Sequence, residues 1–225
     1  MFRINFLWLS YLKWAVICFL SGGILFSYEI PLILKHTDIR LNSEDQNPGS
    51  AHVFTQLGWK WGLLCVLCDI GKAWLPVHLS AQILDISSLY FAMIIAAPVL
   101  GHAIAPYNSV SGGKGIAPAF GTLLGLLPYR EIVYLLAVIY VFFAAILVIK
   151  PNRICSIVTF SIFAIVSLIM EIGTNCLSVG IGCLIISTVV ILKHASDHTP
   201  QKSFSIRFLP TLFEHKAPTR QQNSN

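Results

Sequence analysis

The stretch His102–Pro106 (HAIAP) is followed by the turn Ser111–Gly115 (SGGKG), and both lie between strongly apolar segments. The apolar flanks decide the fold, because segments of this kind cross a membrane as helices. A glycine-rich turn that opens onto a helix start presents backbone N–H groups, and Lys114 adds a positive charge. The sequence therefore predicts an anion site at the end of two membrane helices.

The composition supports a membrane protein. The chain has 225 residues, of which 56% are hydrophobic and only 11% are charged, and its mean hydropathy is +0.74. Soluble domains have about 25% charged residues, so water would be a poor solvent for this chain. We expect one compact helical bundle with no soluble domain.

Six apolar segments have the length that a membrane-spanning helix needs. They are residues 14–34, 61–79, 88–105, 132–149, 154–172 and 176–192. Residues 116–128 are also apolar but short, so they would cross only with help from neighbouring helices. Counting this segment predicts an all-α bundle of seven transmembrane helices.

The placement of Lys and Arg predicts the orientation. With seven helices and the N-terminus outside, eleven of these residues lie in the cytoplasmic segments 35–60, 106–115, 150–153 and 193–225. Arg3, Lys13 and Arg130 remain outside, and six helices would weaken this agreement. We expect residues 1–208 to form a single domain with a cytoplasmic C-terminus. The polar tail 209–225 is predicted to be disordered.

Charge and cysteine usage exclude several classes of function. The net charge of +5 does not come from a basic cluster, so no nucleic-acid partner is expected. All six cysteines lie in apolar segments, and Cys65 and Cys68 lack a second pair of ligands. We interpret the cysteines as core residues and expect no metal and no cofactor.

A second turn, Asn47-Pro48-Gly49, precedes Ser50, which can cap a helix. On the predicted topology both glycine-containing turns face the cytoplasm and could converge on one anion. The alternative for the Asn47-Pro48-Gly49 turn is that it only connects two helices. Residues 43–46 (SEDQ) are interpreted as a solvated loop face.

Two further polar features lie in the helices. His102, near a cytoplasmic helix end, is either a proton-transfer group or an interfacial histidine. Asp69 and Lys72 are three residues apart, so they share a helix face and can neutralise each other. They form either a structural pair or a functional intramembrane site.

Several motifs in order resemble the acyl-phosphate-dependent glycerol-3-phosphate acyltransferases of bacteria, the PlsY family. The resemblance covers roughly residues 20–208. The motifs that carry it are residues 21–28 (SGGILFSY), 38–40 (DIR), 47–51 (NPGSA), 57–58 (LG), 69–72 (DIGK), 101–102 (GH), 112–117 (GGKGIA), 120–121 (FG) and 124–128 (LGLLP).

The resemblance implies a seven-helix enzyme of the bacterial inner membrane with its active site at the cytoplasmic face. It implies acyl transfer from acyl phosphate to the 1-hydroxyl of glycerol 3-phosphate, giving lysophosphatidic acid beside the membrane lipid, without a cofactor. Catalytic roles would fall on Asn47, His102 and Lys114. The phosphate-binding residues would be Arg40, Gly49, Ser50, Gly112, Gly113 and Gly115.

The chain departs from the family pattern at several positions. Residues 43–46 replace the usual Gly-Ser-Gly, His52 replaces an asparagine, and Thr55 replaces an arginine. The C-terminal motif is only hinted at by residues 193–198 (KHASDH). These departures keep two alternatives open. One is a diverged paralogue that binds an anionic lipid precursor or acylates another acceptor. The other is a small transporter of a phosphorylated solute, suggested by Glu29 and the Asp69–Lys72 pair.

Overall fold

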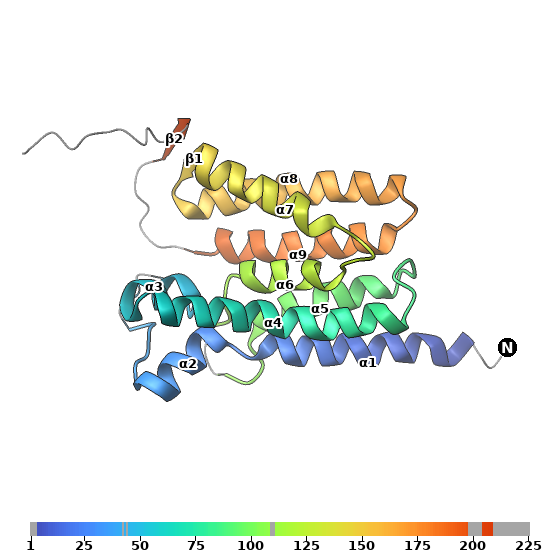
Figure 1. Ribbon diagram of the computed structural model, residues 1–225, viewed down its shortest axis with the longest axis horizontal. Coiled ribbons are helices and arrows are strands. Elements are labelled where there is room, and N and C mark those ends of the chain that lie inside the picture. Colours follow the sequence, from blue (N-terminus) through green and yellow to red (C-terminus); the bar gives the residue numbers. More distant parts are fainter. Residues whose placement is uncertain (1–3, 42, 44, 109–110, 198–203, 209–225) are drawn as a thin grey trace, which may run out of the picture.

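The computed structural model describes residues 4–41, 43, 45–108, 111–197 and 204–208, which form helices that lie side by side along one axis (Figure 1). The elements in chain order are α1 (Ile4–Gly23), α2 (Phe26–Lys35), α3 (Ser50–Leu57), α4 (Trp59–Ile83), α5 (Phe91–Ile104), α6 (Ile116–Gly125), α7 (Ile132–Val141), the π-helical turn η1 (Phe142–Ile146), β1 (Leu147–Lys150), α8 (Asn152–Gly173), α9 (Leu177–Ala195) and β2 (Ser205–Phe208).

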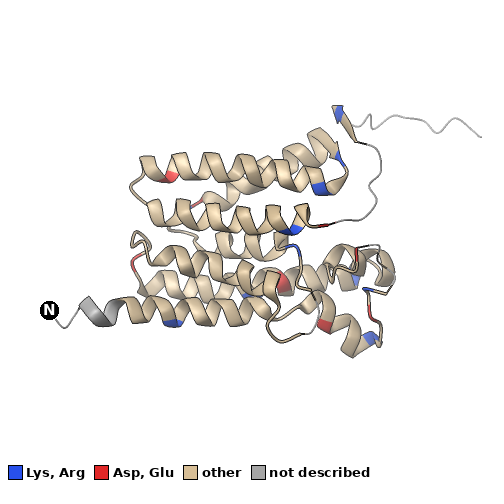
Figure 2. Cartoon of the chain, turned by 180° about the vertical axis from the view of Figure 1, so that it is seen from behind, with Lys and Arg blue, Asp and Glu red and all other residues tan. Residues whose placement is uncertain are grey.

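The connections lie alternately at two ends of the bundle. Residues 36–41, 45–49, 105–108, 111–115 and 195–197 meet at one end, which we call the charged end, where Lys193 Nζ donates to the Gly112 carbonyl at 3.3 Å. At the opposite end, the Tyr11 hydroxyl donates to the Asp85 carbonyl at 3.1 Å. Figure 2 shows Lys, Arg, Asp and Glu gathered mainly at the charged end, away from the N-terminus. The bundle therefore has one polar end, and its sides are apolar.

Helix length and composition agree with a membrane protein. Among the described residues, α4, α8 and α9 are long and apolar enough to cross a bilayer. Residues 8–23 of α1 form a fourth candidate together with α2, from which they are bent by 43°. The apolar helices α5, α6 and α7 with η1 are shorter.

The first predicted span, residues 14–34, is interrupted, which corrects the expectation of one continuous helix. The Tyr28 N–H donates to the Leu25 carbonyl at 2.9 Å, so the Ile24 carbonyl loses its usual helical donor. The break separates α1 from α2 and directs the Ile24 carbonyl to Lys72.

The predicted helix 132–149 also ends early. After Val141 the chain passes through η1 into β1, which pairs antiparallel with β2 through Leu147↔Phe208. The β-branched residues Val148 and Ile149 favour a strand once a partner strand is available, and that partner is distant in sequence. The short segment 116–128 is helical only as far as Gly125. The predicted disordered tail, 209–225, lies outside the described residues.

Close packing fixes the position of α6. A Cβ at Gly121 would lie 2.2 Å from the Ile70 carbonyl oxygen, and one at Gly125 would lie 2.9 Å from the Trp74 carbonyl oxygen. Glycines four residues apart let α6 approach the α4 backbone in this way. The start of α6 is thereby held beside the charged end of α4. The cysteines are free and all except half-buried Cys68 are buried, as expected of core residues.

Candidate active site

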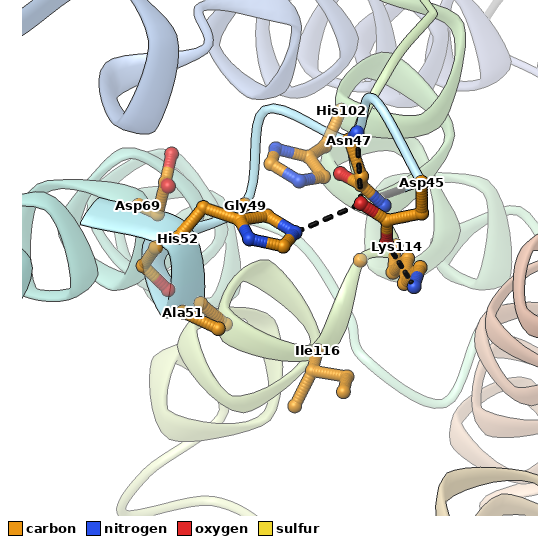
Figure 3. Close-up of a pocket in the computed structure, with 12 residues that line it drawn as sticks. Asp45, Asn47, Gly49, Ala51, His52, Asp69, His102, Lys114 and Ile116 are labelled. Atoms are coloured by element: carbon orange, nitrogen blue, oxygen red, sulfur yellow. Dashed lines mark hydrogen bonds and ion pairs between the residues drawn. The ribbon is translucent and has the colours of Figure 1, made fainter. Parts of the chain in front are cut away.

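A pocket of about 150 Å³ opens at the charged end (Figure 3). It is formed by the loop before α3, the first turns of α3 and α6, and side chains from α4 and α5. Its lining consists of Asp45, Asn47, Gly49, Ser50, Ala51, His52, Asp69, His102, Lys114, Gly115, Ile116 and Ala117. The structure thus brings together the two glycine-containing turns that the sequence placed on one membrane face.

Two helix N-termini face this pocket. Gly49 precedes α3 in an extended conformation, and Gly115 precedes α6 with φ 85°, a left-handed conformation that favours glycine. The first turns of both helices line the pocket. Helix N-termini present unpaired N–H groups and a positive partial charge, so the arrangement suits an anion.

Lys114 lies between two carboxylates. Its Nζ is 2.6 Å from Asp45 Oδ2 and 2.7 Å from Asp197 Oδ2, and its side chain is 26% exposed. Arg153 donates to the backbone carbonyls of Asp197 and of Ala195, the latter at 2.7 Å, which secures the segment after α9. The lysine therefore joins the loop before α3 to the end of α9.

Asp45 corrects the interpretation of residues 43–46 as a solvated loop face. The other oxygen of its carboxylate, Oδ1, accepts from His52 Nε2 at 2.8 Å and from the Asn47 N–H at 3.1 Å. Its side chain is 13% exposed. The polar composition of the loop predicted solvation, but Asp45 also pairs with Lys114, which lies 69 residues away in the sequence.

Hydrogen bonding outweighs burial in this cluster. Burial opposes the charge on Asp45, but hydrogen bonds from His52 and Lys114 hold the pKa of its carboxyl below the usual range. Burial likewise opposes the charge on Lys114, but hydrogen bonds to Asp197 and Asp45 raise its pKa. Lys114 and Asp45 are therefore both charged at neutral pH.

Asp69 and Lys72 form an ion pair, with Lys72 Nζ 2.6 Å from Asp69 Oδ1 and both side chains almost fully buried. The pair is not isolated, because Lys72 Nζ also lies 2.9 Å from Nδ1 of His102. His102 itself is 5% exposed and lines the pocket with Asp69. The ion pair of α4 and the histidine of α5 thus form one cluster behind the pocket.

Asn47 lines the pocket with a buried side-chain oxygen, Oδ1, that has no hydrogen-bond partner within the described part of the chain. Buried polar atoms are normally paired, so an unpaired amide group in a pocket is suited to a ligand. The Asn47 amide can bind a hydroxyl or a phosphate oxygen.

Three predicted residues do not line the pocket. Arg40 instead pairs with Asp38 at 2.6 Å, and its guanidinium lies over the Tyr28 ring. Gly112 and Gly113 pack on the end of α5. A Cβ at Gly112 would lie 2.3 Å from the Ala103 carbonyl oxygen, and one at Gly113 would lie 2.1 Å from His102 Nε2. The two glycines let the turn approach His102.

Sequence reasoning missed Asp45, His52 and Asp197 as members of the site. A signal was present for the first two, because both are departures from the family pattern that the sequence showed. Asp197 lies in the weakly matching C-terminal motif. Among the described residues, no group of three or more His, Cys, Asp or Glu side chains is arranged to hold a metal ion.

Sequence comparison identifies relatives over most of the chain. The profile of the family described as "Glycerol-3-phosphate acyltransferase" matches residues 12–200. The glycerol-3-phosphate acyltransferase of Hydrogenobaculum sp. is 32% identical over 130 residues, which is 57% of this chain and 65% of that protein. The corresponding protein of Chlorobaculum tepidum is 32% identical over 168 residues, 70% of each chain. The chain thus spans less than two thirds of the Hydrogenobaculum protein.

Solved structures share the fold. The crystal structure of PlsY, an integral membrane glycerol 3-phosphate acyltransferase, in its glycerol 3-phosphate form matches with a TM-score of 0.70 and 23% identity. That match covers 86% of this chain and 96% of the other. The lysophosphatidic acid form matches with a TM-score of 0.67 and 24% identity, over 82% and 88% of the two chains. The extent of the family match and the shared fold establish that this chain belongs to the glycerol-3-phosphate acyltransferase family, PlsY.

Proposed function

We propose that the protein transfers a fatty acyl group from an acyl phosphate to the 1-hydroxyl of glycerol 3-phosphate, giving lysophosphatidic acid for phospholipid synthesis. The observation that carries the proposal is the convergence of two helix N-termini and Lys114 on one pocket. Both substrates carry a phosphate group, and this arrangement favours phosphate. The names of the relatives support acyl transfer to glycerol 3-phosphate.

In this reaction the hydroxyl oxygen of glycerol 3-phosphate forms an ester bond to the acyl carbon. The bond from that carbon to the phosphate oxygen breaks, and inorganic phosphate and the hydroxyl proton are released. An acyl phosphate is already activated, so positioning and charge neutralisation can supply the catalysis without a cofactor.

We assign the phosphate contacts to Lys114, Gly115 and the first turns of α3 and α6. Gly49 and Ser50 form the start of α3, and the amide of Asn47 binds a glycerol hydroxyl. His102 contacts the reacting group. Gly112 and Gly113 shape the turn that lies against the Nε2 edge of its ring at Gly113, and Arg40 pairs with Asp38 within the loop before α3.

The two carboxylates on Lys114 set a condition for binding. A substrate phosphate has to replace Asp45, Asp197 or both as the partner of Lys114, because two negative groups repel each other at this distance. The partial exposure of Lys114 allows such an exchange. Asp45 and Asp197 therefore hold the lysine in place before a substrate arrives.

The direct test uses the purified full-length protein in lipid nanodiscs with acyl phosphate and glycerol 3-phosphate. Mass spectrometry should detect lysophosphatidic acid. Lys114→Ala should lower kcat/KM by about 100–1,000-fold, the cost of removing one preorganised charged donor. Lys13→Ala, an exposed position on α1, is the matched control and should retain activity. Equal activity of Lys114→Ala and wild type would remove Lys114 from the site.

We further propose that residues 1–208 form one domain that crosses the bacterial plasma membrane seven times. The N-terminus is then outside and the charged end in the cytoplasm. The proposed count assigns one pass each to the bent pair α1–α2, to the three long helices and to the three shorter apolar helices, of which the bent pair and the long helices have the length of a span. The concentration of Lys and Arg at the charged end supports the cytoplasmic assignment (Figure 2).

Cysteine labelling of intact cells tests this topology. Leu41, which is 82% exposed, lies at the charged end, and Leu89, which is 59% exposed, lies at the opposite end. A membrane-impermeant maleimide should label Leu89→Cys directly, and Leu41→Cys only after permeabilisation. The wild-type chain measures the background from its own cysteines. Labelling of both variants from the same side would contradict the proposal.

A second candidate is acyl transfer to an acceptor other than glycerol 3-phosphate. The contact between Asp45 and His52 favours it, because two departures from the family pattern touch each other and add a carboxylate to the pocket. A panel of hydroxyl acceptors with one acyl phosphate separates the two candidates. A higher kcat/KM with an uncharged or cationic acceptor would favour the second.

A further inference from the structure

Lys72 is surrounded by three acceptors inside the bundle. Its Nζ contacts Asp69 Oδ1 at 2.6 Å, His102 Nδ1 at 2.9 Å and the Ile24 carbonyl oxygen. The side chains of Lys72 and Asp69 are 2% and 3% exposed, so water does not compete for these contacts. The three partners come from α4, α5 and the break between α1 and α2.

The ammonium group of Lys72 has only N–H donors, and this determines which atom donates in its contact with His102. A carboxylate and a carbonyl can only accept, and the ammonium group has three N–H donors and no acceptor. Lys72 therefore donates to the Ile24 carbonyl and to Nδ1 of His102, and its positive charge pairs with the Asp69 carboxylate. A neutral imidazole whose Nδ1 accepts carries its proton on Nε2.

Two serine side chains fix the positions of Asp69 and Lys72 by hydrogen bonds. Ser27 Oγ donates to Asp69 Oδ2 at 2.6 Å, and Ser21 Oγ donates to the Lys72 carbonyl at 2.7 Å. Both serines flank the break after α1. The break that frees the Ile24 carbonyl therefore also positions Ser27, which donates to the Asp69 carboxylate.

The other edge of the His102 ring faces the glycine turn. A Cβ at Gly113 would lie 2.1 Å from Nε2, and the Gly113 N–H donates to the His102 carbonyl at 3.1 Å. His102 lines the pocket together with Lys114 and Gly115. The proton on Nε2 is thus on the side of the turn that would hold phosphate.

We propose that Lys72 is a positioning residue that fixes His102 as the Nε2–H tautomer, so that His102 donates a hydrogen bond to a substrate oxygen and does not accept a proton. This inference rests on the proposed function for the identity of the substrate. On this proposal His102 is a hydrogen-bond donor, which is an alternative to the proton-transfer role expected from the sequence. The tautomer itself does not depend on the substrate.

Nitrogen NMR of the full-length protein in nanodiscs tests the tautomer directly. With ¹⁵N-labelled histidine at pH 7, the chemical shifts distinguish a protonated ring nitrogen from an unprotonated one, and the His102→Gln spectrum assigns the signals of His102. We expect a protonated Nε2 and an unprotonated Nδ1 in the wild type. The reverse pattern, or a doubly protonated ring, would overturn the proposal.

A matched pair of variants tests the donor role. The amide nitrogen of a glutamine can take the place of Nε2, and that of an asparagine lies nearer the place of Nδ1. His102→Gln should stay within about tenfold of wild-type kcat, whereas His102→Asn should fall by about 100-fold, the cost of a misplaced group. Equal losses in both variants, with the fold retained, would contradict donation from Nε2.

Lys72→Met then tests the positioning role. The His102 signals of this variant should show a mixture of tautomers, and kcat should fall by about 100-fold while KM changes less. An unchanged tautomer would assign Lys72 a purely structural role. If the wild type makes no lysophosphatidic acid, the proposed function fails, but the NMR result still decides the tautomer.

Discussion

The regions around Lys72 and Lys114 both neutralise the charge of a lysine, but they differ in how exposed that lysine is. Each lysine lies 2.6 Å from an aspartate, but the Lys72 side chain is 2% exposed and that of Lys114 is 26% exposed. The partners of Lys72 lie in α4, in α5 and in the buried break between α1 and α2. The partners of Lys114 come from two loops beside a pocket. The buried contacts of Lys72 are therefore permanent, whereas Lys114 can exchange its carboxylate partners for a ligand.

The largest expected effect separates the two regions by stability. Asp69→Asn leaves Lys72 as a buried charge without its counter-ion, which costs about 3–5 kcal/mol. Asp45→Asn removes one of two carboxylates from a partly exposed lysine and should cost at most about 1 kcal/mol. Thermal unfolding in detergent, followed by circular dichroism, measures both. The double variant Asp69→Asn/Lys72→Met should recover part of the loss. Equal losses for Asp69→Asn and Asp45→Asn would erase the distinction.

The glycine turn that connects the two regions gives the next effect. Gly113→Ala would place a Cβ 2.1 Å from His102 Nε2, and overpacking of this kind costs about 1–3 kcal/mol. The variant should also lose activity, because His102 and Lys114 are displaced. Gly71→Ala is the control, since nothing lies within 4 Å of its Cβ. It should be neutral or stabilising by up to about 1 kcal/mol. A fully active and stable Gly113→Ala protein would contradict the close approach.

Steady-state kinetics sharpen the comparison at Lys114. Asp45→Asn removes a carboxylate that the substrate phosphate has to replace, so KM for glycerol 3-phosphate should fall by up to about fivefold, the equivalent of about 1 kcal/mol. Asp38→Asn, a loop carboxylate outside the pocket lining, is the matched comparison. An increase of KM in Asp45→Asn would mean that Asp45 helps to bind the substrate.

The smallest effect is the pH dependence of the Lys114 cluster. The pKa of Asp45 is lowered in the folded protein, so its stabilisation is complete above the unfolded value of about 3.9 and is lost as the pH falls through the lower folded value. The pKa of Lys114 is raised, so its stabilisation is complete below about 10.4 and is lost at higher pH. The difference in Tm between wild type and Asp45→Asn should be constant from pH 5 to 9 and vanish in strong acid. A difference that fades near pH 7 would contradict this assignment.

Most of the helical pattern could be predicted from the sequence, because a long apolar run has few alternatives in a bilayer. The expected spans 61–79 and 154–172 lie within α4 and α8, and the expected span 176–192 lies within α9 except for its first residue. The break at Ile24 could not be predicted, since it depends on Lys72, which is distant in sequence and supplies the donor that the helix does not. The strand β1 likewise depends on β2.

The candidate site was predictable where local chemistry determines it. The turns at Gly49 and Gly115 predict that a helix begins after each of them. The spacing of Asp69 and Lys72 predicts that both lie on one face of a helix. Asp45 was missed because its partner Lys114 lies 69 residues away. From the sequence alone, a carboxylate in a polar loop is predicted to be solvated, because a cation that is distant in the sequence comes near it only in the folded chain.

The bend between α1 and α2 has a consequence for how the protein responds to its lipid. A straight first span would return the Ile24 carbonyl to its own helical ladder and remove one of the three acceptors of Lys72. Thick bilayers favour extended, upright spans, and thin ones favour shortened or tilted spans. If α1 and α2 straighten in a thick bilayer, Lys72 loses its contact to the Ile24 carbonyl, and the tautomer proposed for His102 loses one of its supports.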